Sequence, residues 1–158
     1  MARPTHMDAS SAAGFSLVEM VCVIAIVAAL AAIALPRLPL GTSRARLEAY
    51  AVEAAALLKA DRTAALRRGR PVATTVDAPG RVLRSGDGRR EVRLPKDVTM
   101  KAVLPQFCND RPAGSAIAFF PSGLSCGGVV AFTRNGAGYE VKVNWLTGGV
   151  EIVQRRTS

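Results

Sequence analysis

Residues Phe15 to Leu35 read FSLVEMVCVIAIVAALAAIAL and contain one charged side chain, that of Glu19, before Pro36 ends the apolar run. As a helix, these 21 residues would extend roughly 30 Å, which matches the hydrocarbon core of a bilayer. A helix buried in a large core can also be apolar all round, but this chain offers only a small domain around it. The run therefore predicts a transmembrane helix over residues 15–35.

The overall composition narrows the class of protein. The chain has 158 residues, enough for one modest domain, and its 49% hydrophobic content is too high for a disordered protein. Its three cysteines are too few for a small protein held together by disulfides. The only histidine, His6, lies in the polar stretch before the apolar run. Catalytic Ser-His-Asp and Cys-His groups and histidine-ligated metals are therefore disfavoured, and we expect no enzyme, cofactor or metal site.

Two kinds of N-terminal signal could contain the apolar run. A cleavable secretory signal peptide would end at the small-x-small sequence AIA, residues 32–34, and release a soluble β protein. Such signals begin with a basic segment and keep charge out of the apolar part. Here only Arg3 precedes the run and Glu19 lies inside it. A secreted soluble protein is therefore the weakest of the functional hypotheses.

The sequence GFSLVE, residues 14–19, followed by an unbroken apolar helix and a proline, resembles the class III leader motif of type IV pilins and type II secretion pseudopilins. The resemblance implies that a prepilin peptidase cuts after Gly14 on the cytoplasmic side and methylates the new N-terminus, Phe15. The leader would span residues 1–14, starting at Met1 or Met7. Glu19 is the fifth residue after the cut, where the family keeps a glutamate.

Glu19 needs a physical reason to lie in an apolar helix. A carboxylate in lipid costs at least ~2.5 kcal/mol on insertion scales. The resemblance implies that its partner is the α-amine of a neighbouring subunit, which cleavage before Phe15 creates, so that Glu19 sets the register of assembly. Alternatively, Glu19 reaches the lipid headgroups and interacts favourably with the helix N-terminus.

The charges beside the run bear on membrane orientation. Arg37, Arg44 and Arg46 follow it and Arg3 precedes it, so the positive-inside rule argues for a cytoplasmic C-terminal part. The leader motif implies the opposite, because its cleavage site must face the cytoplasm. We follow the motif and expect a single-pass inner-membrane protein with its C-terminal domain in the periplasm.

A second helical pattern follows, with apolar residues three and four apart between about Thr42 and Arg68. Thr42 or Ser43 can cap its start, and Gly69 can end it. We assign residues 36–69 to this amphipathic helix, which continues the spine begun by the transmembrane helix.

Beyond residue 69 the pattern changes to short strands separated by glycine-containing turns. The fold class that we predict is pilin-like α+β, with a long N-terminal helix packed on a small antiparallel β domain over residues 70–158. The expected strands are 71–76, 81–84, 89–94, 116–120, 129–133, 139–145 and 150–153.

Two blocks of this β domain indicate a branch of the family. IAFFPSG, residues 117–123, and VKVNWLTGGV, residues 141–150, resemble the C-terminal half of the H-type minor pseudopilins. The T-type minor pilins of DNA uptake share the first block, so a minor type IV pilin that binds DNA is the alternative. The H-type resemblance implies the major pseudopilin, other minor pseudopilins and a prepilin peptidase as partners. We assign Phe119, Val143 and Trp145 to the core.

Cys108 and Cys126 flank a loop rich in proline and glycine. In an oxidising periplasm the pair is expected to form a disulfide, worth ~3 kcal/mol for a loop of this length. Two buried free thiols, or half of a metal site, are the alternatives. Cys22, in the membrane helix, is interpreted as a small apolar residue.

The charge balance is strongly basic, with 21 Lys and Arg against 12 Asp and Glu and a net charge of +9. A basic face of this kind is typical of nucleic-acid binding, but it is also compatible with a solvated surface. Aromatic residues for stacking on single strands are scarce. The candidate basic surface with the most arginines comprises Arg81, Arg84, Arg89, Arg90 and Arg93.

Overall fold

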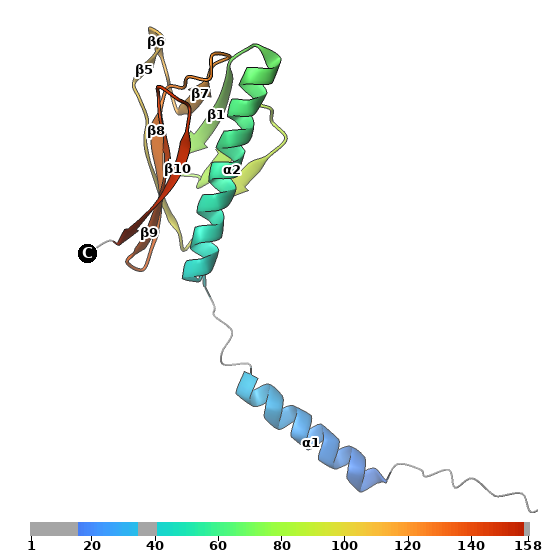
Figure 1. The fold of residues 1–158 in the computed structure, drawn as a ribbon. Helices are drawn as coiled ribbons and strands as arrows, with labels where there is room; N and C mark the ends of the chain where they lie inside the picture. The colour runs from blue at the N-terminus through green and yellow to red at the C-terminus, as the bar shows by residue number, and fades with distance from the viewer. Residues whose placement is uncertain (1–15, 35–40, 157–158) are drawn as a thin grey trace, which may run out of the picture. The chain divides into compact units, whose positions relative to one another are not determined.

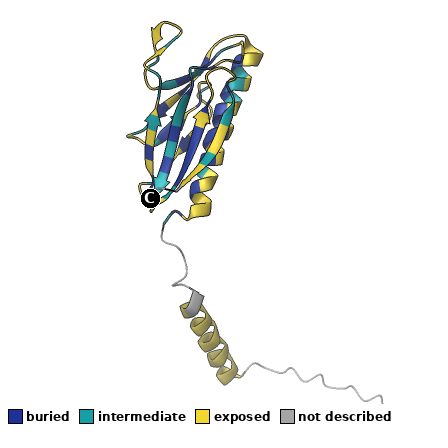
Figure 2. Cartoon of the chain, turned by 60° about the vertical axis from the view of Figure 1, so that its left-hand side comes forward, coloured by how far each residue is buried: buried dark blue, intermediate teal, exposed yellow. Residues whose placement is uncertain are grey.

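The computed structural model describes residues 16–34 and 41–156. The chain divides into two compact units, Met1–Leu40 and Gly41–Ser158. The first contains helix α1, Leu17–Ala34, in which every side chain described, through residue 32, is exposed (Figures 1 and 2). No helix in the described ranges has the length and apolar character needed to cross a membrane. The ends of the predicted span, Phe15 and Leu35, lie outside the described residues.

The second unit begins with three non-helical residues and then helix α2, Arg44–Arg68. Ser43 caps it by accepting a hydrogen bond from the Arg46 amide at 3.2 Å, and Gly69 ends it in the left-handed conformation with φ 61°. The sequence predicted a cap at Thr42 or Ser43 and an end at Gly69, and the structure confirms Ser43 as the cap and Gly69 as the end. Its buried face is built mainly from alanine, which allows strands to approach closely: Leu47, Ala51, Ala54, Ala55, Leu57, Leu58, Asp61 and Ala65.

Two four-stranded antiparallel sheets and one short hairpin form the rest of the described domain. The first sheet has the order β3-β2-β1-β7, with β1 Val72–Asp77, β2 Val82–Arg84, β3 Glu91–Arg93 and β7 Ala116–Phe119. The second has the order β10-β9-β8-β4, with β4 Thr99–Val103, β8 Gly128–Arg134, β9 Ala137–Val143 and β10 Val150–Arg156. The hairpin pairs β5, Phe107–Cys108, with β6, Arg111–Pro112.

Helix α2 packs on strands of both sheets, and the core lies between them (Figure 2). This arrangement confirms the α+β class. Phe119 and Val143 are buried as predicted. The largest fully buried hydrophobic side chains are Phe119, Phe132, Leu47, Leu58, Leu83, Ile117, Val82, Val98, Val130 and Val141.

The assignment of Trp145 to the core was wrong, because its side chain is 66% exposed. Strand β9 ends at Val143, and the Asn144 side chain then accepts hydrogen bonds from the amides of Leu146 and Thr147 at 2.9 and 3.0 Å. This local turn ends the alternation of the strand. Trp145 therefore belongs to a turn on the surface.

Strand β4 and the β5–β6 hairpin were missed by the sequence reading. In β4 only Met100 is buried, and Val103 at its end is 72% exposed, so the apolar alternation is weak. The hairpin turns through Asn109 and Asp110, both with positive φ, a conformation more usual for glycine.

Candidate functional site

Of the candidate residues near the N-terminus, only Glu19 lies among the residues that the structure describes. Glu19 lies in the first turn of α1, where its amide bonds to the Ser16 carbonyl at 3.0 Å. A carboxylate at this end of a helix interacts favourably with the helix dipole. Gly14 and Phe15 lie outside the described residues, so leader cleavage and methylation stay predictions.

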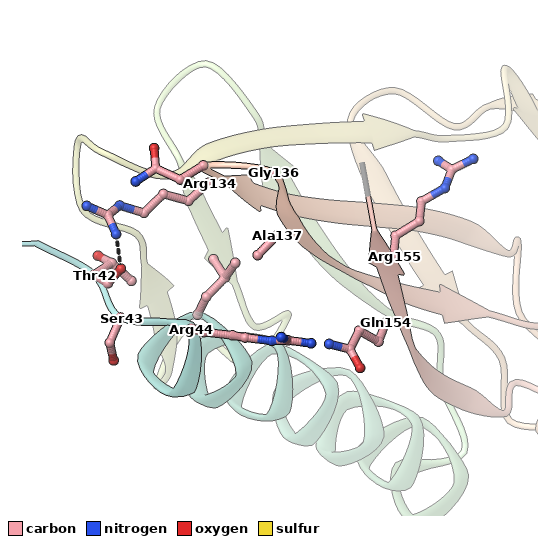
Figure 3. A pocket seen from close by; sticks show the side chains of 10 residues that line it. Thr42, Ser43, Arg44, Arg134, Gly136, Ala137, Gln154 and Arg155 are labelled. Atoms are coloured by element: carbon pink, nitrogen blue, oxygen red, sulfur yellow. Dashed lines mark hydrogen bonds between the residues drawn. The ribbon is translucent and has the colours of Figure 1, made fainter. Parts of the chain in front are cut away.

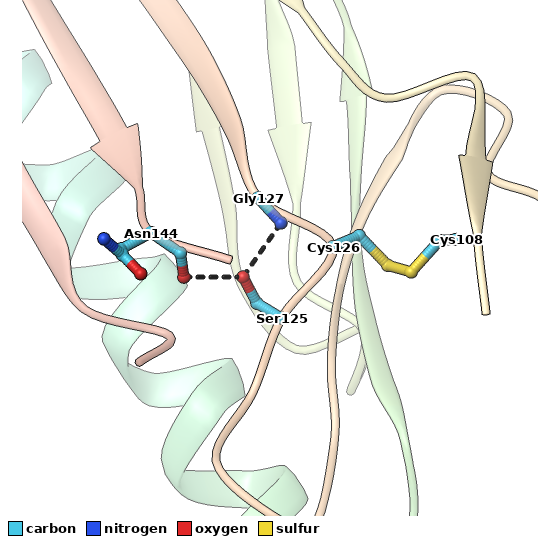
Figure 4. The surroundings of a disulfide bond; sticks show 5 residues. All are labelled: Cys108, Ser125, Cys126, Gly127 and Asn144. Atoms are coloured by element: carbon cyan, nitrogen blue, oxygen red, sulfur yellow. Dashed lines mark hydrogen bonds between the residues drawn. A yellow bond between two sulfur atoms is a disulfide. The ribbon is translucent and has the colours of Figure 1, made fainter. Parts of the chain in front are cut away.

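The second candidate feature is the disulfide (Figure 4). Cys108 and Cys126 are bonded, with 5.5 Å between their Cα atoms, and the bond joins β5 to the loop before β8. The predicted pairing is therefore confirmed. Next to it, the Ser125 hydroxyl donates to the Asn144 carbonyl at 3.1 Å and accepts from the Gly127 amide at 2.9 Å.

The predicted basic surface gathers around the β2–β3 hairpin, but carboxylates interrupt it. Glu91 pairs with Arg84 at 3.4 Å on the neighbouring strand and with Arg93 at 3.2 Å on its own strand. Its hydrogen bond with Arg93, and then the charge of that arginine, lower the pKa of Glu91. Arg89 and Arg90 line a hollow of about 430 Å³ between this hairpin and α2. Arg81 has a positive φ and a buried Nε without a partner among the described residues.

A further hollow, of about 450 Å³, lies at the start of α2 (Figure 3). Arg134, from the end of β8, donates to the Thr42 carbonyl and pairs with Asp97 at 2.8 Å. The Thr42 amide also donates to Asp97 at 2.9 Å, and this bond is the main cause that lowers the pKa of Asp97. Arg155 pairs with Glu140 at 2.6 Å. The bond from Arg134 to Thr42 attaches the start of the domain to the second sheet, whereas the Arg155–Glu140 pair joins β9 and β10 within that sheet.

Sequence reading missed a buried polar cluster around Asp61. Its carboxylate accepts from the Thr74 hydroxyl at 2.6 Å, the Ser85 hydroxyl at 2.5 Å and the Gly86 amide at 2.9 Å. Asp61 therefore ties α2 to β1 and to the turn after β2. A lone aspartate inside an apolar helical stripe was the available signal.

Two sequence comparisons indicate the protein family to which this chain belongs. Residues 9–35 match the family model described as the prokaryotic N-terminal methylation motif. The chain is 32% identical over 144 residues to the type II secretion system protein H of Xanthomonas campestris pv. campestris, covering 91% of this chain and 85% of that protein. This chain belongs to the type II secretion system protein H family.

Solved structures share the fold of this H-family chain. The minor pseudopilin EpsH of Vibrio cholerae aligns with a TM-score of 0.54 at 13% identity, over 68% of this chain and 95% of that one. The type IV minor pilin FimU of Pseudomonas aeruginosa aligns with a TM-score of 0.53 at 18% identity, over 73% and 97%. The pilin-like fold is therefore confirmed.

The similarity in sequence to the Xanthomonas protein distinguishes pseudopilins from type IV minor pilins, which the fold alone does not. Because a pseudopilin and a type IV pilin align about equally well, fold similarity carries no preference between them. The identity to a secretion protein H supports the pseudopilin prediction and does not support the DNA-uptake alternative. The H family comprises structural subunits, and its prepilin motif implies a membrane-anchored periplasmic protein.

Proposed function

We propose that this H-family chain is a minor subunit of the periplasmic pseudopilus, the short filament that drives folded proteins across the outer membrane. The 32% identity over 91% of the chain carries the proposal. In this role the chain performs no catalysis and needs no cofactor. Its work is to assemble with the major pseudopilin and other minor pseudopilins.

Helix α1 supplies the anchor in this proposal, together with Phe15 and Leu35 at its flanks. Its exposed residues are almost all apolar, for example Leu17 at 80% and Val18 at 67% exposure. A helix that is apolar all round needs lipid or other apolar helices around it. We therefore place α1 in the inner membrane before assembly and among the helices of other subunits afterwards, with the domain from Gly41 onward in the periplasm.

Processing by a prepilin peptidase is the first part of the proposal to test. Mass spectrometry of membrane-extracted protein should show a chain that begins with methylated Phe15. Gly14→Trp should leave the leader attached, because a bulky residue blocks the site before the cut. A chain that keeps its leader without this substitution, or that begins at Leu35, contradicts the proposed processing.

The role of Glu19 is the second part to test. We propose that its carboxylate pairs with the α-amine of Phe15 on a neighbouring subunit. Glu19→Ala should leave the chain cleaved and inserted but lower its crosslinking to the major pseudopilin, whereas Ser16→Ala should not. Normal crosslinking of the Glu19 variant would favour a carboxylate that only reaches the headgroups.

Deletion of the gene tests the function itself. Export of folded proteins should stop, with the cargo retained in the periplasm, and the unmodified gene should restore it. Normal export without the gene would contradict the proposal.

A further inference from the structure

The one tryptophan of the chain lies at the edge of an apolar hollow. Trp145, at 66% exposure, lines a hollow of about 360 Å³ with Phe120, Leu124 and the disulfide residue Cys108. A second hollow, of about 380 Å³, shares Phe120 and Cys108 with the first, reaches Cys126 as well, and is lined mainly by alanine and proline. We call Phe120, Leu124 and Trp145, with the disulfide, the Trp145 platform.

The loops that carry the platform are fastened to each other. The Ser125 amide donates to the Trp145 carbonyl at 3.0 Å, and the disulfide attaches β5 to the next residue, Cys126 (Figure 4). Gly148 has φ 61°, and a Cβ there would lie 2.3 Å from the Gly123 carbonyl oxygen. The close approach of the two loops therefore requires glycine at position 148.

Hydrogen bonds from helix α2 also hold the same two loops in place. The guanidinium of Arg62 donates to the Thr147 carbonyl at 2.9 Å and to the Gly123 carbonyl at 3.4 Å. An apolar surface whose backbone is already fixed loses little conformational entropy on binding. Tryptophan is among the residue types enriched at the few positions that carry most of the binding energy of an interface.

The position of the platform leaves it accessible to a neighbour. Arg62 lies 18 residues after Arg44, the first residue of α2, or ~27 Å along the helix. The N-terminal segment joins the domain at Gly41, beside the start of α2. Figure 1 shows the β5–β6 hairpin at the end of the domain where α2 finishes. The platform thus lies at the end of the domain opposite to that junction.

Charge decides which partner fits. Arg111 lines the hollow next to the disulfide, and Arg62 contacts the two loops that carry the platform. Neither arginine pairs with a carboxylate of the described residues. The whole chain carries +9, so a second copy would bring like charge to the same contact. An acidic partner would instead be attracted by both the local arginines and the overall charge.

We propose that the Trp145 platform is the docking surface for a different, acidic protein, which presents an apolar patch ringed by carboxylates. This inference rests on the proposed function, because the partner is a neighbour of this chain in the secretion apparatus. It adds the face that makes the contact and the chemistry of the protein that meets it.

Photo-crosslinking of the full chain in secreting cells tests the platform. Leu124→p-benzoylphenylalanine places the probe in the hollow, and Val52→p-benzoylphenylalanine, at an exposed position on α2, is the matched control. We expect a specific adduct from position 124 with a component of the apparatus whose net charge is negative. Adducts only with a second copy of this chain, equal yields of one adduct from both positions, or no adduct would overturn the proposal.

Substitutions in the Leu124 probe chain test the contribution of each group. Trp145→Ala should lower the adduct yield about tenfold, as expected for a central anchor, and Trp145→Phe should restore part of it. Arg111→Glu should also lower the yield, whereas Val52→Ala should not change it. An unchanged yield with Trp145→Ala, in protein that keeps its disulfide and melting temperature, would overturn the platform.

Export separates this inference from the proposed function. If deletion of the gene stops export while Trp145→Ala and Arg111→Glu leave both export and the adduct unchanged, the docking surface is wrong and the function stands. If deletion leaves export intact, the proposed function itself is wrong.

Discussion

Helix α1 and helix α2 differ in how far their side chains are buried within their own compact units. Leu30 of α1 is 62% exposed, and no described side chain of α1 is buried. Leu58 of α2 is completely buried in the core that the helix forms with the strands it packs on. Contacts within its own domain therefore stabilise α2, whereas under the proposed function the stabilisation of α1 comes from lipid or from other subunits.

The sharpest test of this difference is the same substitution in both helices. Leu58→Ala should destabilise the domain by about 2–5 kcal/mol, because it removes buried methyl groups and leaves a cavity. Leu30→Ala should leave domain unfolding unchanged. Thermal or urea unfolding of the detergent-extracted protein measures both. A similar loss from the two variants would show that α1 is part of the folding unit.

Removal of the disulfide should have a somewhat smaller effect, also confined to the domain. Cys108→Ser should lower the free energy of unfolding by about 3 kcal/mol, the chain-entropy value for a loop closed over this separation of 18 residues. Cys22→Ser is the control, because Cys22 is free and lies in α1. Unchanged domain stability in the Cys108 variant would show that the hairpin is fixed by its other contacts.

Local signals made much of the domain predictable. Ser43 and Gly69 act on the residues next to them, so their roles as caps could be read directly. The first three strands were visible from alternation, which the burial of Val72, Thr74 and Val76 in β1 reflects.

The buried polar cluster that sequence reading missed depends on residues far away in the chain, and the misassigned Trp145 depends on both local and distant contacts. Asp61 is satisfied by groups on β1 and on the turn after β2, and none of them is implied by its own neighbours. The exposure of Trp145 follows from the local turn at Asn144 and from its link to Ser125, twenty positions earlier. The candidate assembly site had the opposite character, since GFSLVE is recognisable without any tertiary context.

Acidification should loosen the start of the domain by a smaller amount. The pKa of Asp97 is lowered in the folded state, mainly by the Thr42 amide, so this contribution is present above the unfolded pKa and is lost as pH falls below about 4. Asp97→Asn should therefore reduce the loss of melting temperature between neutral pH and pH 3. Asp110→Asn, in the exposed β5–β6 turn, controls for the loss of one charge. An equal acid sensitivity in all three proteins would assign no role to the Thr42 bond.

The smallest expected effect concerns DNA, because the charge that could bind it belongs to the domain and the α1 helix contributes only Glu19. Any protein of charge +9 should bind duplex DNA weakly at low salt, and affinity should fall with a slope of about −0.9 in log salt for each phosphate contact. Glu91 between Arg84 and Arg93 removes part of the attraction that five arginines would otherwise exert. Replacing both Arg89 and Arg90 by glutamate should abolish the binding to DNA at low salt, and Glu91→Gln should strengthen that binding slightly. Near physiological salt, neither the unmodified protein nor Glu91→Gln should still bind DNA. Micromolar affinity that persists there, joined to loss of DNA uptake on reversing the two arginines, would assign the basic hairpin a function that the secretion family does not imply.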